Sequence, residues 1–451
     1  MFRRLNLDLL LILLIFLTAP LFFYKLGQSS LVSFDEAWYG DIARNIIKNK
    51  DLINLKFNGN AYLDHPPAGF WLIAASENFF GANEFGVRFA PSLSGLFCML
   101  ILYLLGNKLF SRSVGFAAAL SLPSAFWFLF RARSGNLDVI LTFFFLLTIY
   151  FSILASKEKK FLLPWSIALS YLILTKTLIP FTILPALLII FWKSSYKLKD
   201  FKLPLIVFAI LGGWFMYNVF TNQQFFSHFF KIGLPGVSVE TNYIDNFKLI
   251  NEYLHSGVGK WFWPGIASLL FGLFLMQKRF LILSIFFLSF FIPFIFSQKG
   301  HIWHLIPIFP IMILSSFGVA YFFLKKILKN EIVIFILFMA IVSYVWYLQV
   351  RRSYYEFIDV PAFVSDEAIL SKEASKYPWD YYIDGDFVPA AIFYSEKIVK
   401  QISTDELQGL FERQEPILLI TYKWRLDQFK IKNEQYEVLK TDRDKMLILI
   451  K

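Results

Sequence analysis

Long apolar runs, separated by short polar segments, dominate the first 350 residues of the chain. A helix of about 20 mostly apolar residues is long enough to cross the hydrocarbon core of a bilayer. The pattern therefore predicts eleven membrane spans, at residues 7–26, 89–107, 113–130, 137–156, 161–175, 177–193, 203–220, 261–277, 280–297, 302–324 and 331–350. The spans 161–175 and 177–193 are short, and each contains proline.

Composition agrees with a polytopic membrane protein. Of the 451 residues, 57% are hydrophobic and only 17% are charged, whereas a soluble domain carries about 25% charge. With a mean hydropathy of +0.56, the chain is neither a string of soluble domains nor disordered. The one cysteine, Cys98, lies in an apolar run, which excludes a disulfide framework and a cysteine-based metal site.

The net charge of +11 is unevenly distributed. Residues 1–350 carry 29 Lys/Arg and 15 Asp/Glu, whereas residues 351–451 carry 15 and 18. The basic residues gather in alternate short loops, which is typical of loops on the cytoplasmic side. This alternation predicts a cytoplasmic N-terminus and an external tail. Because the basic residues punctuate apolar runs instead of forming a patch on a polar chain, we expect no nucleic-acid partner.

With this orientation, the titratable residues gather on the outer side, mostly in the outer loops 27–88 and 221–260. All five histidines lie in outer loops or at outer helix ends: His65, His228, His255, His301 and His304. Four acids lie there too: Asp35, Glu36, Asp64 and Asp138. A purely structural bundle has no reason for this arrangement, so it indicates a functional site on the outer face.

The first outer loop predicts two helices. Apolar positions at helical spacing in residues 33–50 predict an amphipathic helix on the membrane surface. Ser33 and Glu36 have the spacing of a capping box, so helix capping is one explanation of Glu36 and of the neighbouring Asp35. After two prolines, residues 67–80 predict an apolar helix that is too short to cross the membrane.

Motifs in this loop resemble those of a known enzyme family. FDEAWYGDIARNI is followed by YLDHPPAGFWLIA and then by FG-x-NEF-x-x-R. This order resembles the bacterial glycosyltransferases related to protein O-mannosyltransferases and to the lipid A aminoarabinose transferase, which have the GT-C fold. Later matches in the same order are Asp138 in RSGNLDVILTFFF, the LTK turn at 174–176, and QKGHIWHLIPIFP. The resemblance covers residues 1–350.

The resemblance implies an all-α polytopic membrane protein with about 11–13 transmembrane helices, in which residues 1–350 form the glycosyltransferase domain. Such enzymes move a sugar from a polyprenyl-phosphate donor to a lipid, glycan or protein acceptor. The active site would lie on the extracytoplasmic face of the bacterial inner (cytoplasmic) membrane, among membrane lipids. The donor's tail can stay in the bilayer, and no nucleotide-binding fingerprint occurs. The sugar, the lipid length and the acceptor stay open.

By this resemblance, Asp35 is the general base that accepts the proton of the acceptor hydroxyl, with Glu36 as its structural or metal-linked neighbour. Asp138 matches the family's second acidic position and orients the base, the acceptor or a cation; an N-cap is the alternative. Attack from one side predicts inversion at the sugar carbon. A divalent cation (Mg or Mn) on these three carboxylates stays open. His301 and His304 have a spacing able to hold a metal, but without a third ligand we favour substrate contact.

Further outer residues are candidates for binding the donor phosphate or sugar: Tyr62, Asp64, His65, Lys176, Lys299, His301 and His304. At the position of His65 the aminoarabinose transferases carry lysine, whereas the protein mannosyltransferases have His-Pro-Pro. Lys176 lies between apolar runs, where an unpaired charge costs roughly 2.5–3.5 kcal/mol, and this favours a function. Arg131 and Arg133 are either phosphate partners or interfacial charges.

The tail 351–451 holds 18 of the 33 acidic residues and differs in character from the rest. ILLITY (417–422) predicts a buried strand, STDELQGLFER predicts a capped helix, and YEVLKTDRDKMLILIK predicts two strands. We therefore expect a small soluble α/β domain in the external compartment. It shows no catalytic pattern.

Two other functions fit part of the sequence. A transporter or flippase of lipid-linked sugars would use charged residues along a path, but no internal repeat occurs and the ionisable residues lie at one face. An O-antigen-type polymerase or ligase would depend on arginines and histidines of a later loop, so Asp35 would be dispensable.

Overall fold

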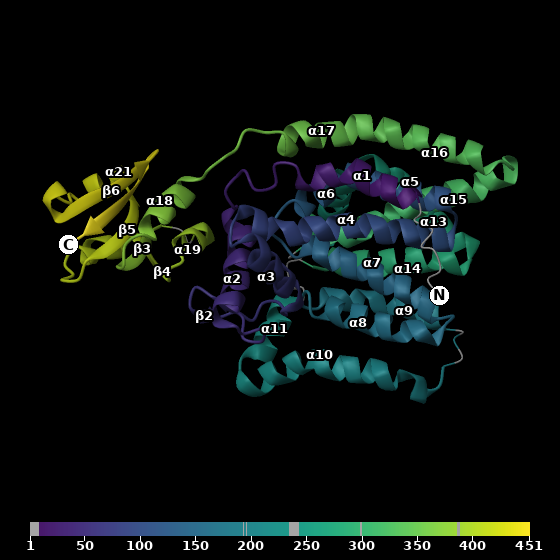
Figure 1. The fold of residues 1–451 in the computed structure, drawn as a ribbon, viewed down its shortest axis with the longest axis horizontal. Helices are drawn as coiled ribbons and strands as arrows, with labels where there is room; N and C mark the ends of the chain where they lie inside the picture. Colours follow the sequence, from purple (N-terminus) through teal and green to yellow (C-terminus); the bar gives the residue numbers. More distant parts are fainter. Residues whose placement is uncertain (1–8, 193, 195, 234–242, 298–299, 386–387) are drawn as a thin grey trace. The chain divides into compact units, whose positions relative to one another are not determined.

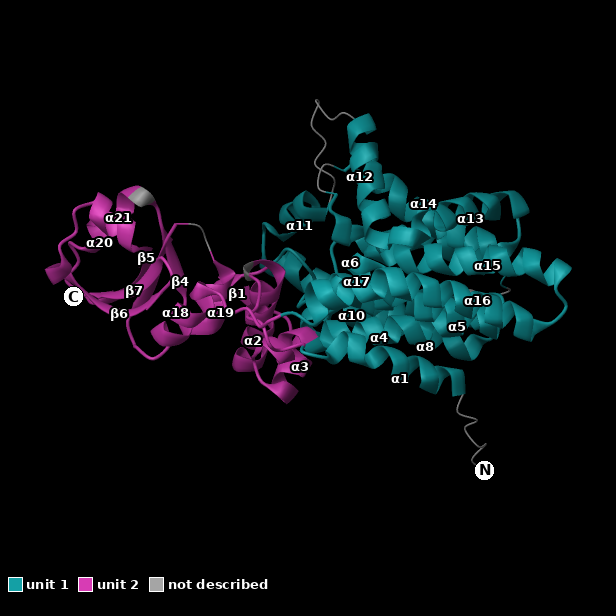
Figure 2. Cartoon of the chain, turned by 90° about the horizontal axis from the view of Figure 1, so that it is seen from above, with its two compact units in different colours: residues 1–25, 63–72, 89–360 teal, residues 26–62, 73–88, 361–451 magenta. Residues whose placement is uncertain are grey.

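The computed structural model describes residues 9–192, 194, 196–233, 243–297, 300–385 and 388–451 (Figure 1). The chain forms two compact units (Figure 2). The first contains residues 1–25, 63–72 and 89–360, and the second contains residues 26–62, 73–88 and 361–451. Most of the first outer loop thus belongs to the unit that contains the tail, and a division into residues 1–350 and 351–451 does not represent this.

The first unit is helical (Figure 1). Among the described residues, seven helical stretches have the length and apolar composition of membrane spans: Glu84–Leu109 (α4), Asp138–Ala155 (α7), Lys199–Thr221, Tyr243–Leu275, Lys278–Ile295 (α14), Ile302–Ile327 and Glu331–Ile358. A pair bent by 75°, Arg112–Ser124 and Phe126–Ala132, is an eighth if it is one span. Within these stretches lie α5 (Arg112–Ser121), α6 (Phe126–Ala132), α10 (Lys202–Thr221), α12 (Tyr243–Val258), α13 (Phe262–Leu275), α15 (Phe309–Ile327) and α16 (Glu331–Val345).

Every one of the predicted spans coincides with helix, but three helices are short: α1 (Leu9–Phe23), α8 (Leu162–Ile173) and Ile179–Phe191, which contains η4 (Ile179–Ile183) and α9 (Leu184–Phe191). Prolines explain two of them. Pro164 lies in the first turn of α8, and Pro180 and Pro185 lie at the starts of η4 and α9, where a missing N–H is tolerated. The polytopic helical fold is confirmed, and in the described part of the chain seven or eight segments are long and apolar enough to cross a membrane.

Neighbouring helices of the first unit pack through their apolar faces. α7 contacts α8 and α9, α8 contacts α10, and α13 contacts α14 and α15. Phe145 on α7 lies edge-on to Phe286 and Phe290 of α14. α4 and α5 approach closely, since a Cβ atom added to Gly106 would lie 2.5 Å from the Cα of Gly115. Close packing of this kind holds α7 and α8 side by side.

In the first outer loop the chain forms η1 (Ser33–Ala37), α2 (Trp38–Asn49), β1 (Lys56–Phe57), β2 (Asn60–Ala61) and α3 (Ala68–Phe80). Both predicted helices are confirmed, and α2 buries an apolar stripe that includes Ile42 and Ile46. The side chain of Ser33, one half of the predicted capping box, lies outside what the structure describes. α2 follows Ala37 without a side-chain cap, and Glu36 Oε2 instead accepts the Val32 N–H at 2.8 Å.

The tail forms a five-stranded sheet in the order β4-β3-β5-β7-β6. Its strands are β3 (Asp380–Asp384), β4 (Val399–Ile402), β5 (Ile417–Tyr422), β6 (Tyr436–Asp442) and β7 (Lys445–Ile450). β3 is parallel to β4 and β5, and β7 is antiparallel to β5 and β6. The short helices between them are α18 (Asp366–Ala374), α19 (Pro389–Ser395), α20 (Leu407–Leu410) and α21 (Lys423–Gln428). The predicted α/β tail and its three strands are confirmed.

Within the second unit, side chains fasten the first outer loop to the tail. The Tyr394 hydroxyl accepts the Leu31 N–H at 2.7 Å and donates to Glu84 at 3.0 Å. Asn58 exchanges two hydrogen bonds of 2.8 and 2.9 Å with the backbone of Val399. The loop that carries Asp35 is therefore held by the tail.

Glu77 on α3 is a buried carboxyl group, 2% exposed, and neither of its oxygens has a hydrogen-bond partner among the described residues. Burial raises its pKa well above the usual range, although the charge of Arg44 opposes the shift. The folded state therefore binds this proton more tightly than the unfolded state. The protonated Glu77 carboxyl thus favours the folded state at low pH, and this stabilisation is lost as the pH rises above about 4.5.

We expect Glu77→Gln to raise the melting temperature at pH 8 but to change it little at pH 4.5. The gain is about 1.4 kcal/mol for each pH unit over which the folded carboxyl keeps its proton. Thermal unfolding of the purified protein at the two pH values measures it, with the exposed Glu412→Gln as the control. Equal shifts at both pH values would contradict the pKa argument.

Candidate active site

A buried ion-pair cluster surrounds Asp138 at the start of α7. The Asp138 side chain is 2% exposed. Lys176 Nζ lies 2.5 Å from one carboxylate oxygen, and Arg131 Nη2 lies 2.6 Å from the other. The three residues together carry one net positive charge, in surroundings where burial strengthens charge interactions. Such a cluster is suited to an anionic ligand.

The turn before α7 leaves the Asp138 carboxylate available to pair with cations. Asn136 Oδ1 accepts the Asp138 N–H at 2.9 Å, and Asn136 Nδ2 donates to the Arg131 carbonyl. Asn136 thereby satisfies the helix start. The residue at the N-cap position is Leu137, so the N-cap explanation of Asp138 does not hold. Its carboxylate is instead shared between the two cations.

Two of the predicted histidines, His65 and His304, lie within electrostatic range of Lys176 and Asp138. Burial and the charge of Lys176 lower the pKa of His65 to about 3. The ring is therefore neutral at physiological pH, and His65 Nδ1 lies 3.2 Å from Thr177 Oγ1. A neutral imidazole offers a phosphate oxygen one N–H donor without adding charge.

The predicted pair His301 and His304 lies at the start of η7 (Ile302–Ile308), where His304 Nδ1 accepts the His301 N–H at 3.4 Å. The His301 ring stacks on Trp303 with centroids 4.5 Å apart. The Arg131 guanidinium lies 5.5 Å from the centroid of Trp303 on the same segment. The structure thus brings η7 to the Asp138 cluster. The predicted phosphate partner Lys299 lies outside the described residues.

Asp64 has a partner that is distant in sequence. Its Oδ1 lies 2.6 Å from Nε2 of His228 on α11 (Phe225–Gly233). Thr177 Oγ1, which faces His65, also lies 3.5 Å from the Asp64 carbonyl. This pair ties α11 to the His-Pro-Pro turn beside the cluster.

In the second unit, Asp35 has an unusual backbone conformation. Its φ of +58° and ψ of −71° are disfavoured for a residue with a side chain, and such strain costs about 1–3 kcal/mol. The Trp38 N–H donates to the Asp35 carbonyl and closes the turn. Strained residues of this kind cluster at functional sites, which agrees with the predicted role of Asp35.

Arg88 holds this turn in place. Its guanidinium donates to both oxygens of Glu36, at 2.8 Å each, so the pair is bidentate. It also donates to the carbonyls of Leu26, Ser29 and Ser30. Arg88 is 7% exposed and Glu36 is 4% exposed. Glu36 is thus a structural neighbour of the candidate base.

Tyr62 belongs to an aromatic group of the second unit. The Trp38 ring stacks on Phe57 at 4.8 Å and meets Tyr62 edge-on at 6.4 Å. Tyr62 is 6% exposed. These contacts give the tyrosine a packing role behind α2.

The predicted acidic residues are poorly suited to a divalent cation. Both oxygens of Glu36 accept hydrogen bonds from Arg88, and both oxygens of Asp138 face cations. A metal ion would have to displace these positive groups. In the described ranges, no cluster of three or more His, Cys, Asp or Glu residues has the geometry of a metal site.

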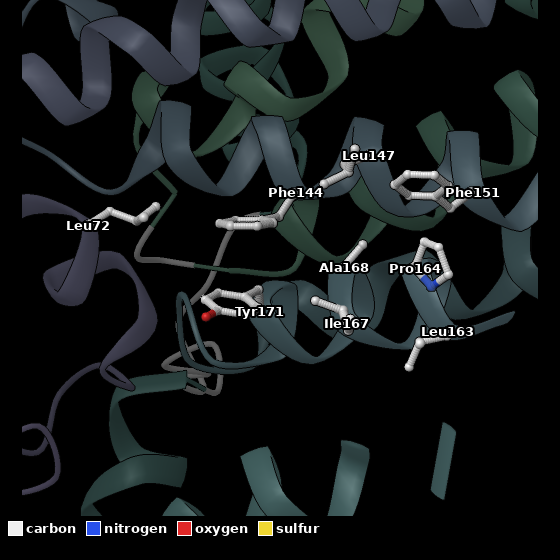
Figure 3. Close-up of a pocket in the computed structure, with 9 residues that line it drawn as sticks. All are labelled: Leu72, Phe144, Leu147, Phe151, Leu163, Pro164, Ile167, Ala168 and Tyr171. Carbon is white, nitrogen blue, oxygen red and sulfur yellow. The ribbon is translucent and has the colours of Figure 1, made fainter. Parts of the chain in front are cut away.

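An apolar groove of about 460 Å³ lies along α7 and α8 (Figure 3). It is lined by Leu72, Phe144, Leu147, Phe151, Leu163, Pro164, Ile167, Ala168 and Tyr171. The rings of Phe144 and Tyr171 stack at 5.4 Å. The same two helices lead to the charged cluster, since α7 begins at Asp138 and Lys176 follows the end of α8. A charged head site and an apolar groove thus share two helices.

Sequence reasoning did not assign roles to three residues of these sites. Arg88 is the last residue of the motif FG-x-NEF-x-x-R, so the motif itself was the available signal. His228 was placed only among outer-loop histidines, and Thr177 was not singled out. The partners of His228 and Thr177 are 164 and 112 residues away in sequence, and no local pattern indicates such pairs.

Several known proteins match part of this chain in sequence. The family model described as dolichyl-phosphate-mannose-protein mannosyltransferase matches residues 64–229. An uncharacterised protein of Aquifex aeolicus (strain VF5) is 32% identical over 219 residues, which cover 47% of this chain and 44% of that protein. The undecaprenyl phosphate-alpha-4-amino-4-deoxy-L-arabinose arabinosyl transferase of Pseudomonas savastanoi pv. phaseolicola is 34% identical over 145 residues, 32% of this chain and 27% of that protein. The chain thus matches less than half the length of these curated relatives.

Solved structures agree on the fold. The crystal structure of ArnT from Cupriavidus metallidurans in the apo state has a TM-score of 0.75 and 15% sequence identity, covering 97% of each chain. The structure of the same protein bound to undecaprenyl phosphate has a TM-score of 0.74. At this identity the likeness establishes the fold of the chain.

Proposed function

We propose that this chain, which belongs to the GT-C superfamily of protein O-mannosyltransferases and ArnT-type transferases, moves a sugar from a polyprenyl-phosphate donor to an acceptor hydroxyl. The acceptor is a lipid, a glycan or a protein of the cell envelope. The reaction takes place on the extracytoplasmic face of the inner membrane, with the N-terminus in the cytoplasm. The side follows from the alternation of basic loops.

The buried Asp138 cluster is the observation that carries this proposal. A departing polyprenyl phosphate gains negative charge as its bond to the sugar breaks. Lys176 and Arg131 would stabilise that charge, because they are held in position before the reaction and are shielded from water. Asp138 acts as a positioning residue that keeps both cations in place. His65 and His304 would add hydrogen bonds to the phosphate.

The groove along α7 and α8 would take the isoprenoid tail of the donor. Its lining is almost entirely apolar, and it lies along the two helices whose ends carry the charged cluster. A lipid with an anionic head matches this combination of charge and apolar surface. The tail never needs to leave the bilayer.

Asp35 would act as the general base. It takes the proton of the acceptor hydroxyl while the acceptor oxygen bonds to the sugar carbon and the bond to the phosphate oxygen breaks. A single attack of this kind inverts the configuration at that carbon. Glu36 and Arg88 maintain the turn that presents Asp35.

A panel of radiolabelled donors tests the proposal. Purified protein in nanodiscs receives undecaprenyl phosphate carrying mannose, glucose, galactose or 4-amino-4-deoxyarabinose, and release of the sugar is followed. We expect turnover of one donor. Lys176→Met should lower kcat/KM for it by roughly 10²–10³, the usual effect of removing one stabilising donor.

Because Lys176→Met leaves Asp138 with one cation fewer, a second variant controls for folding. Lys176→Met combined with Asp138→Asn restores the charge balance and should elute as a folded protein with the same loss of activity. Lys248→Met, an exposed lysine of the same unit, should be fully active. Movement of labelled lipid across liposomes without sugar release would instead establish a flippase. Full activity of both Lys176 variants would remove the phosphate assignment.

A further inference from the structure

A second pocket lies in the second unit, on the sheet of the tail. Its volume is about 490 Å³, within the range of about 300–1,000 Å³ that is usual for ligand pockets. Tyr377 and Trp379, between α18 and β3, form one wall, and Pro416 lies before β5. Glu437, Leu439, Leu449 and Lys451 come from β6, from β7 and from the residue after β7.

The aromatic wall is preorganised. The rings of Tyr377 and Trp379 are nearly parallel, with 13° between their planes and centroids 5.5 Å apart. Both side chains are half-buried. No described residue forms a hydrogen bond with the Tyr377 hydroxyl or with the Trp379 indole nitrogen. The wall therefore offers apolar ring surface together with two unused polar groups.

The charged part of the lining is electrically neutral as a pair. Glu437 Oε2 pairs with Lys451 Nζ at 2.7 Å, and the two side chains are 54% and 67% exposed. β6 has a bulge between Val438 and Lys440, which redirects the side chains of the lining residue Leu439 and its neighbours. Bulges of this kind are frequent beside binding sites.

We propose that this pocket binds a saccharide. The axial C–H groups of a pyranose form an apolar face that suits an aromatic ring, and its hydroxyls donate and accept hydrogen bonds at its edge. The pocket supplies both, with a carboxylate acceptor, an ammonium donor, a hydroxyl and an indole N–H around the rings. A paired carboxylate and ammonium favour a neutral, hydroxyl-rich ligand over a phosphate or a metal ion. The exposed polar rim disfavours an acyl chain.

This site is independent of the transferase chemistry, because it uses none of the residues of the Asp138 cluster or of the Asp35 turn. It would let the tail hold a glycan on the external side. The proposal therefore concerns binding of a sugar polymer, whichever donor the enzyme uses.

An array of defined hexose, N-acetylhexosamine and pentose oligosaccharides tests it with the full-length protein in detergent. We expect at least one oligosaccharide to be retained, and titration calorimetry should show its affinity reduced tenfold or more in Trp379→Ala and in Tyr377→Ala. Trp379→Phe keeps a ring and should keep most of the binding. Trp424→Ala removes a tryptophan that is 55% exposed in the same unit and should bind like the wild type.

Two comparisons separate this site from the active site. Asp35→Asn should keep the saccharide affinity, whereas Trp379→Ala should keep release of sugar from the lipid donor. Retention of no oligosaccharide by the wild type, or of peptides only, would overturn the proposal. Equal affinity in the wild type and in Trp379→Ala would overturn it as well.

Discussion

Asp35→Gly should make the protein inactive and at the same time more stable to heat. Glycine adopts a φ of +58° without the clash that a Cβ atom causes. Relief of the strain should exceed the entropy that glycine adds to the unfolded chain, leaving a gain of about 1 kcal/mol. Loss of the carboxylate should lower kcat by roughly 10²–10⁴, as expected for a general base.

Asp35→Asn separates the two effects. It keeps a side chain of the same shape and should therefore lose activity without gaining stability. Donor affinity should stay unchanged in both variants, because the proposed base acts on the acceptor hydroxyl and not on the donor phosphate. Asp51→Asn, in a turn of the same loop where the Asp51 carboxylate accepts the Ile53 and Asn54 N–H groups, is the matched control and should be active.

Sugar release and thermal unfolding, measured on the same preparations, separate the loss of the base from the relief of strain. An Asp35→Asn protein with wild-type kcat would remove Asp35 as the base and leave the enzyme class standing. An inactive Asp35→Gly protein that melts at a lower temperature than the wild type would contradict the strain argument alone. Functional strain of this kind persists only where the surrounding structure enforces it.

Much of the helical architecture is readable from the sequence because it depends on local information. Apolar runs, helix-terminal prolines and the period of α2 involve residues that are near one another in the chain. The strands at 417–422 and at the end of the tail are likewise signalled by their own composition. The order of the motifs predicts a single site for Asp138, Lys176 and the His301–His304 pair. The structure places these residues together.

Pairs between residues far apart in the chain could not be predicted from the sequence. Glu36 has the spacing of a cap, and its actual partner Arg88 lies 52 residues away. Asp64 reaches His228 across 164 residues. The strained φ of Asp35 is also invisible, since nothing in the dipeptide Asp35-Glu36 requires it. Around it, Arg88 holds Glu36 and the tail holds Leu31, contacts that join residues far apart in the sequence.

Arg88→Lys should impair both stability and turnover, and the two losses should have one origin. All five N–H groups of the Arg88 guanidinium are engaged, by Glu36 and by the carbonyls of Leu26, Ser29 and Ser30. Lysine has three donors and no planar fork, so it cannot restore this set. Lysine keeps the charge but leaves at least two of the five acceptors without a donor, and each buried acceptor left unsatisfied costs about 1–3 kcal/mol.

If Arg88 had only a structural role, Arg88→Lys would lower the amount of folded protein, and the folded molecules would be fully active. A positioning role predicts more: the folded Arg88→Lys fraction should show a reduced kcat with an unchanged KM for the donor. Glu36→Gln should give the same split, and the double variant should be little worse than either single one, because both remove the same clamp. Additive losses in kcat would show that Arg88 and Glu36 act separately, and Asp35 would then owe its conformation to some other contact.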